Sequence, residues 1–133
     1  MKTLNIFISN ACKYGVNYDK IVDCLNKNKD FLWNNTANPM AFENIQDLNE
    51  TYNILEKQIQ KADIVIFASQ MYFKHNDIIR FQYDYTKSLG KPMIIIKPWA
   101  GEDTPEYFTK DNFPMIEYHS EEIIKEIEKI KIK

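Results

Sequence analysis

The sequence predicts an α/β domain built on a parallel sheet, and three observations support this class. Short continuous apolar runs, typical of strands buried on both faces, occur at 4–9, 63–68 and 92–96. The segments between them carry apolar residues at the helical period. The chain has 133 residues, of which 44% are hydrophobic and 27% charged, which fits one globular domain over residues 1–133.

Each element follows from a local pattern. Helices are expected where apolar side chains recur every three or four residues: Tyr18, Ile21, Val22 and Leu25, then Ile45, Leu48, Tyr52, Leu55 and Ile59, then Ile78 to Leu89. A last helix is expected to begin at Ser120 as its cap. Weaker strand patterns at 31–33 and 113–116 complete a five-stranded sheet. Right-handed crossovers then favour the flavodoxin-like strand order 2-1-3-4-5, with helices on both faces.

Composition and charge exclude several kinds of partner. The 17 basic and 19 acidic residues are mixed along the chain, which argues against nucleic acid. No run is long enough for a signal peptide or a membrane span, so we expect a cytoplasmic protein without membrane contact. Cys12 and Cys24 match neither a disulfide framework nor a zinc motif, and we expect no metal. A packed thiol is favoured over a nucleophile at Cys12, because no motif links a histidine to it.

The expected ligand site lies beyond the carboxyl ends of the first and third strands, where the strand order reverses. Those ends read Ser9 to Cys12 and Ser69 to Tyr72. A phosphate-accepting receiver domain would need acids where this chain has Asn10 and Ala68-Ser69. A glycine-rich phosphate loop is also missing. The site therefore needs another chemistry.

Gln82 is the informative residue, because it falls on the same helical stripe as Ile78, Tyr85 and Leu89. A buried amide must find hydrogen-bond partners or cost about 1–3 kcal/mol. Two interpretations stay open: Gln82 bonds a neighbouring loop, or it lines a pocket beside Ser9 and Ser69.

Two interpretations also stay open for each of the two tryptophans. Trp33 and Trp99 follow predicted strands on the expected ligand side. Each either stacks on a base or nicotinamide ring, or covers the core as a large aromatic lid.

Three segments stand out by their order and spacing: Phe7-Ile8-Ser9-Asn10-Ala11, Ala62 to Phe67 with Ser69 and Tyr72 after it, and Leu89 to Trp99. Together they resemble a bacterial TIR-like domain, most of all those of Thoeris antiphage defence. The resemblance covers nearly the whole chain and is strongest from 61 to 99. It implies an enzyme that cleaves the nicotinamide-ribose bond of NAD. NAD would be the substrate, and no bound cofactor is expected. The product would be an ADP-ribose-derived signal for an effector protein, and a homo-oligomer is a further expectation.

The resemblance also implies site residues. The family's catalytic glutamate falls at position 82, which is glutamine here, and Ile78 replaces a tryptophan one turn earlier. Asn10 replaces a histidine. The substrate is expected against a set of residues from both strand ends, the third helix and the two tryptophan positions: Phe7, Ser9, Asn10, Ala11, Trp33, Ser69, Met71, Tyr72, Ile78 and Trp99.

Glutamine at position 82 keeps the shape of a glutamate and loses its charge. Cleavage of an N-glycosidic bond builds positive charge that a carboxylate stabilises, so we expect an impaired form, natural or engineered. Two alternatives stay open. One is a non-catalytic TIR module that works by assembly, and the other is an enzyme similar to nucleoside deoxyribosyltransferases.

Overall fold

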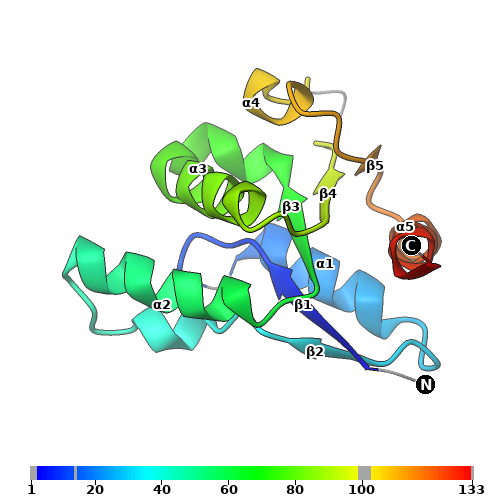
Figure 1. Cartoon of the computed structure of the whole chain (residues 1–133), viewed down its shortest axis with the longest axis horizontal. Helices are drawn as coiled ribbons and strands as arrows, with labels where there is room; N and C mark the ends of the chain where they lie inside the picture. The colour runs from blue at the N-terminus through cyan, green and yellow to red at the C-terminus, as the bar shows by residue number, and fades with distance from the viewer. Residues whose placement is uncertain (1–2, 14, 99–102, 133) are drawn as a thin grey trace.

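The computed structural model describes residues 3–13, 15–98 and 103–132, with side chains up to residue 130. Five parallel strands form one sheet in the order β2-β1-β3-β4-β5, which confirms the predicted α/β layout (Figure 1). The strands are β1 (Leu4–Ile8), β2 (Trp33–Asn35), β3 (Ile64–Ala68), β4 (Met93–Ile96) and β5 (Met115–Ile116). The order reverses between β1 and β3, so the switch point lies at their carboxyl ends.

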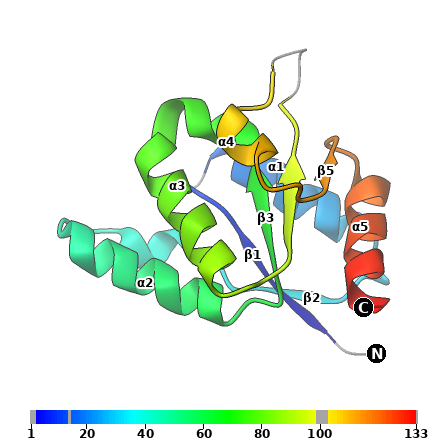
Figure 2. The same ribbon diagram turned by 45° about the horizontal axis from the view of Figure 1, so that its top comes forward.

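Helices cover both faces of the sheet. They are α1 (Val16–Asn26), α2 (Leu48–Gln60), α3 (Tyr72–Ser88), α4 (Glu106–Thr109) and α5 (Ser120–Ile132), with 3-10 turns at Pro39–Phe42 and Ser69–Met71. Helices α1 and α5 pack together, and α2 packs on α3. Right-handed crossovers put these two pairs on opposite faces, as Figure 2 shows.

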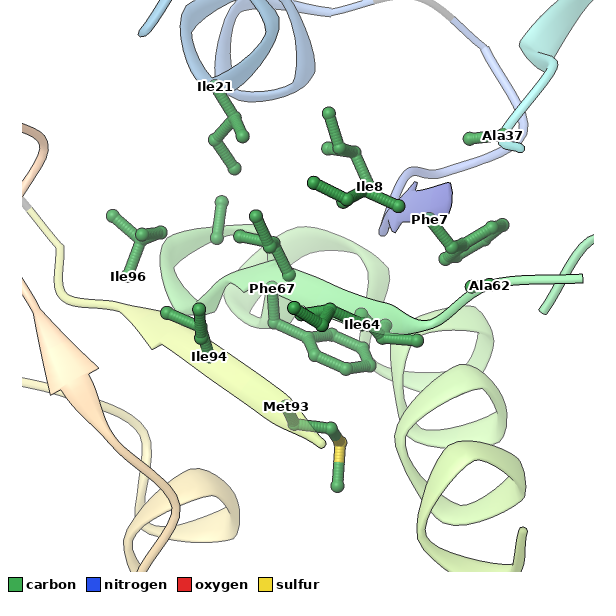
Figure 3. Packing of buried hydrophobic residues seen from close by; sticks show 14 of the residues in the cluster. Phe7, Ile8, Ile21, Ala37, Ala62, Ile64, Phe67, Met93, Ile94 and Ile96 are labelled. Carbon is green, nitrogen blue, oxygen red and sulfur yellow. The ribbon is translucent and has the colours of Figure 1, made fainter. Parts of the chain in front are cut away.

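The core follows from the apolar runs. Every residue of β3 and β4 is buried, because these central strands are covered on both sides. Figure 3 shows their side chains packed with those of β1 and α1, including Phe7, Ile21, Phe67 and Ile94. The edge strands β2 and β5 are short and only partly covered. This weaker coverage explains why their sequence patterns were weaker.

Two local expectations need correction, and a third is confirmed. The second strand begins at Trp33 instead of ending there. The buried stripe of α3 runs through Ile79, Gln82, Tyr83 and Thr86, while Leu89 is exposed and follows the helix. The last helix does begin at Ser120, as expected, and the Ser120 hydroxyl donates to the carbonyl of Cys24 in α1.

Candidate functional site

The carboxyl end of β1 runs straight into a buried polar segment. Ser9 continues the ladder beyond Ile8, because its backbone N–H donates to the carbonyl of Ile66 in β3 at 2.9 Å. Ser9 and Asn10 are 1% and 0% exposed. Polar side chains at this depth need partners inside the protein.

Gln82 of α3 supplies those partners. Its Oε1 accepts from the Ser9 hydroxyl at 2.7 Å and from the Asn10 backbone N–H at 3.2 Å. Its Nε2 donates to the Asn10 carbonyl at 2.7 Å. The side chain is 0% exposed. The interpretation that Gln82 hydrogen-bonds a neighbouring loop is confirmed, and the bond to Ser9 places Gln82 beside that residue; a pocket there stays a prediction.

The Asn10 side chain shapes the turn that follows. Its Nδ2 donates to the carbonyl of Ile8 at 2.9 Å, and its Oδ1 accepts from the backbone N–H of Cys12 at 2.9 Å. This local turn brings Cys12 to a φ of +65°, in the left-handed region. Asn10 thus bonds through its backbone to α3 and through its side chain to its own strand. The sequence suggested only that Asn10 replaced a histidine, and it missed this structural role.

The end of β3 contributes a second buried hydroxyl. Ser69 is 0% exposed, and its Oγ donates to the carbonyl of Ile96 at the end of β4 at 2.8 Å. Ser69 therefore lies at the same sheet edge as Ser9 but faces the neighbouring strand. Met71 is buried just after it. Tyr72 stacks on Tyr107 of α4 with ring centroids 5.5 Å apart, which turns its ring toward α4.

The remaining expected residues are placed less uniformly. Phe7 is wholly buried in the core, where Figure 3 shows it among apolar neighbours. Ala11 and Ile78 are half-buried, and both pack against the core. Trp99 lies outside the described residues. Of these four, Ala11 directly follows the bonded segment Ser9–Asn10.

Trp33 is separated from this cluster. It pairs with Leu4 at the start of β1, so it lies at the amino edge of the sheet, about 16 Å along the strand from Ser9. Its indole N–H donates to the Asn26 side chain at 3.0 Å, at the end of α1. The expectation that Trp33 lies on the ligand side is wrong, because the strand begins two residues later than its apolar pattern suggested.

Both cysteines and His75 have pKa values shifted toward their neutral forms. Burial raises the pKa of the Cys12 thiol to about 11 and also raises that of Cys24, and both cysteines are free. Partial burial, with Lys13 and Lys74 nearby, lowers the pKa of His75. His75 lies at a non-helical position inside α3. The cluster of Ser9, Asn10, Ser69 and Gln82 itself contains no ionisable side chain, so it can orient a ligand or a loop but cannot exchange a proton as an acid or base.

Within the described part of the chain, no group of three or more His, Cys, Asp or Glu side chains could hold a metal ion. Over the same residues, no helix combines the length and apolar character needed to cross a membrane.

The fold and this cluster define a class of protein in structural terms: a parallel α/β domain of flavodoxin-like layout with an uncharged polar cluster at its switch point. No family model matches the chain, and no curated protein matches it at a significant level. Its function therefore has to be argued from the site.

Proposed function

We propose that the chain is a TIR-like domain of the NAD-processing type that holds an NAD-type nucleotide at the switch point but does not cleave it. An active counterpart, with glutamate at position 82, would release nicotinamide and make an ADP-ribose-derived signal for an effector protein. The observation that carries this proposal is the bond between Ser9 and Gln82, residues 73 positions apart that meet at the carboxyl end of β1.

The position of this contact supports a ligand site. In open α/β sheets, ligands bind beyond the carboxyl ends of the strands where the strand order reverses. Ser9 and Gln82 meet at that point from two different elements. Ala11 follows Ser9 in the turn after β1 and is half-buried. A nucleotide would approach over the turn that Asn10 organises, with Tyr72 at the neighbouring strand end.

The chemistry of Gln82 supports the lack of cleavage. Its amide is neutral at every pH, and its Oε1 already accepts two hydrogen bonds from the protein. Loss of nicotinamide leaves positive charge on the ribose, and a neutral amide stabilises that charge far less than a carboxylate. Ser9 and Ser69 are likewise uncharged. Binding and cleavage are therefore separable here.

The complete burial of Gln82 favours a second function. Gln82 is 0% exposed and completes its contacts inside the protein, so its role needs no ligand at all. The chain would then be a non-catalytic TIR-like module that works by assembly. A nucleoside deoxyribosyltransferase-like enzyme stays a third candidate, distinguished by its choice of free nucleosides over NAD.

The deciding experiment is backbone-amide NMR of the wild-type protein titrated with NAD, with a free nucleoside in a parallel titration. We expect NAD to shift the amides of residues 9–12 and 69–72 most, while mass spectrometry detects no nicotinamide. Absence of shifts with either ligand supports the assembly module, and larger shifts with the nucleoside support the third candidate. Shifts confined to another surface contradict the proposed site.

A further inference from the structure

A groove of about 380 Å³ lies on the opposite side of the molecule from α2, between the edge strand β5 and helix α5. Met115 and Ile116 of β5 form its apolar part. Figures 1 and 2 show β5 and α5 together at one edge of the sheet, and among the described residues β5 is the last strand in the sheet order. A short edge strand beside a groove is a common place for another chain to bind.

The helix side of the groove carries four charged side chains of alternating sign. Glu122, Lys125, Glu126 and Lys129 all line it. Their spacing of three and four residues puts them on one face of α5. Lys129 pairs with Glu126 at 3.2 Å, whereas Glu122 and Lys125 have no ion pair among the described residues.

The total charge of the groove argues against a strongly charged partner. Lys97 and Glu117 also line it, so three lysines face three glutamates. An anionic polymer or a polybasic peptide gains nothing from a surface that sums to zero. The order of the charges is what distinguishes this face.

The order of charges along this face of α5 is complementary to itself when two copies of the helix lie antiparallel. A second α5 laid antiparallel, about a two-fold axis between residues 125 and 126, places Glu122 opposite Lys129 of the second copy. The same operation places Lys125 opposite Glu126 of the second copy. Every charge on this face then meets the opposite sign, and two-fold symmetric pairs are the commonest protein assemblies.

We infer that this face, defined by Met115, Ile116 and the four charged residues of α5, is the contact of a two-fold homodimer. Antiparallel α5 helices form its centre, and the second copy covers the groove beside β5. The inference does not depend on the proposed nucleotide function, because no residue of this face belongs to the switch-point cluster.

Charge reversal tests the pairing directly. The variant Glu122→Lys/Glu126→Lys has a wholly basic face, and Lys125→Glu/Lys129→Glu has a wholly acidic one. We expect wild-type protein to dimerise in sedimentation velocity over a dilution series, and each variant to self-associate at least about tenfold more weakly, since like charges then oppose each other. An equal mixture of the two variants should restore the dimer.

The mixture also controls for folding, because misfolded variants cannot restore a specific dimer. Lys57→Glu/Lys61→Glu, at the carboxyl end of the distant helix α2, makes the same change in charge as Lys125→Glu/Lys129→Glu and should leave the dimer unchanged. A monomeric wild-type protein throughout the series, or dimers that persist in both variants, would overturn the inference. A mixture that stays monomeric would overturn the antiparallel pairing. Titration of the monomeric variants with NAD shows whether NAD binding persists without the dimer, so the dimer inference and the nucleotide proposal are tested separately.

Discussion

The side-chain amide of Gln82 and the backbone amide of Asn10 are paired in both directions. Gln82 Oε1 accepts the Asn10 N–H at 3.2 Å, and Gln82 Nε2 donates to the Asn10 carbonyl at 2.7 Å. The Gln82 side chain thereby forms the pair of hydrogen bonds that a neighbouring strand would form, at the point where β1 has ended. The contact needs a donor and an acceptor on one planar group, and an amide provides both at every pH. This pairing makes position 82 structural as well as a candidate for chemistry.

Replacing this amide by an apolar side chain of similar length should be costly. Gln82→Met leaves the Ser9 hydroxyl and both backbone groups of Asn10 without their partner, at about 1–3 kcal/mol for each group that stays unpaired. We expect a loss of about 3 kcal/mol in the free energy of unfolding, measured by urea denaturation. Gln46→Met, at an exposed position, should change the free energy by less than about 0.5 kcal/mol. Equal effects of the two substitutions would refute the structural role.

The variant Gln82→Glu should make stability depend on pH. Ionised, the new carboxylate would be buried against the Asn10 carbonyl, so burial and this oxygen should raise its pKa above that of the unfolded chain. The penalty relative to wild type is then smallest below the unfolded value of about 4.3 and grows as pH rises through the folded pKa. Urea denaturation of both proteins at pH 4 to 8 measures it. A constant difference across this range would contradict the arrangement.

The thiols should be slow to react in the folded protein. Burial raises the pKa of Cys12 to about 11, so at pH 8 only about one thiol in a thousand is ionised. Alkylation by iodoacetamide should be far slower than for free cysteine, and its rate should rise as pH approaches 11. Cys12→Ser/Cys24→Ser should leave NAD binding intact. Loss of binding in a folded double variant would show that a thiol belongs to the site.

Asp111 should contribute to stability in an acid-dependent way. The Lys87 amine at 2.8 Å and the Tyr83 hydroxyl at 2.7 Å lower the pKa of this carboxyl. A lowered folded pKa gives stability that is present above the unfolded pKa, about 3.9, and is lost as pH falls through the folded pKa. Asp111→Asn should therefore flatten the loss of stability between pH 5 and pH 2. An unchanged acid profile would show that the ion pair contributes nothing.

The sheet order could be predicted because its central strands are buried on both faces. Residues of β1, β3 and β4 read as continuous apolar runs, and their boundaries in the structure differ from the predicted ones by at most one residue. Strand β2 was placed about two residues too early. Its residues Trp33–Asn35 are half-buried or exposed, so hydrophobicity does not mark where the strand lies. That shift carried Trp33 to the wrong edge of the sheet.

The candidate site was predictable only in outline. The switch-point rule and the helical stripe both pointed to Gln82 beside Ser9, and the bond between them confirms that position. The pairing with Asn10 could not be predicted, because it depends on the backbone direction after Ile8 and on the turn made by the Asn10 side chain. Periodicity locates a residue on a helix face, but it does not say which hydrogen bonds the residue forms.

Release of nicotinamide from NAD tests the central claim most directly: that the neutral amide at position 82 leaves this site able to hold NAD without cleaving it. Wild-type protein and Gln82→Glu are compared in the same oligomeric state, at a pH where circular dichroism shows both to be folded. We expect wild-type protein to release nicotinamide at the background rate. We expect the variant to release it at least about tenfold faster than that rate, a cautious value for one acid-base group. Wild-type release at an enzymatic rate would contradict the account. So would a folded, NAD-binding Gln82→Glu protein that releases none.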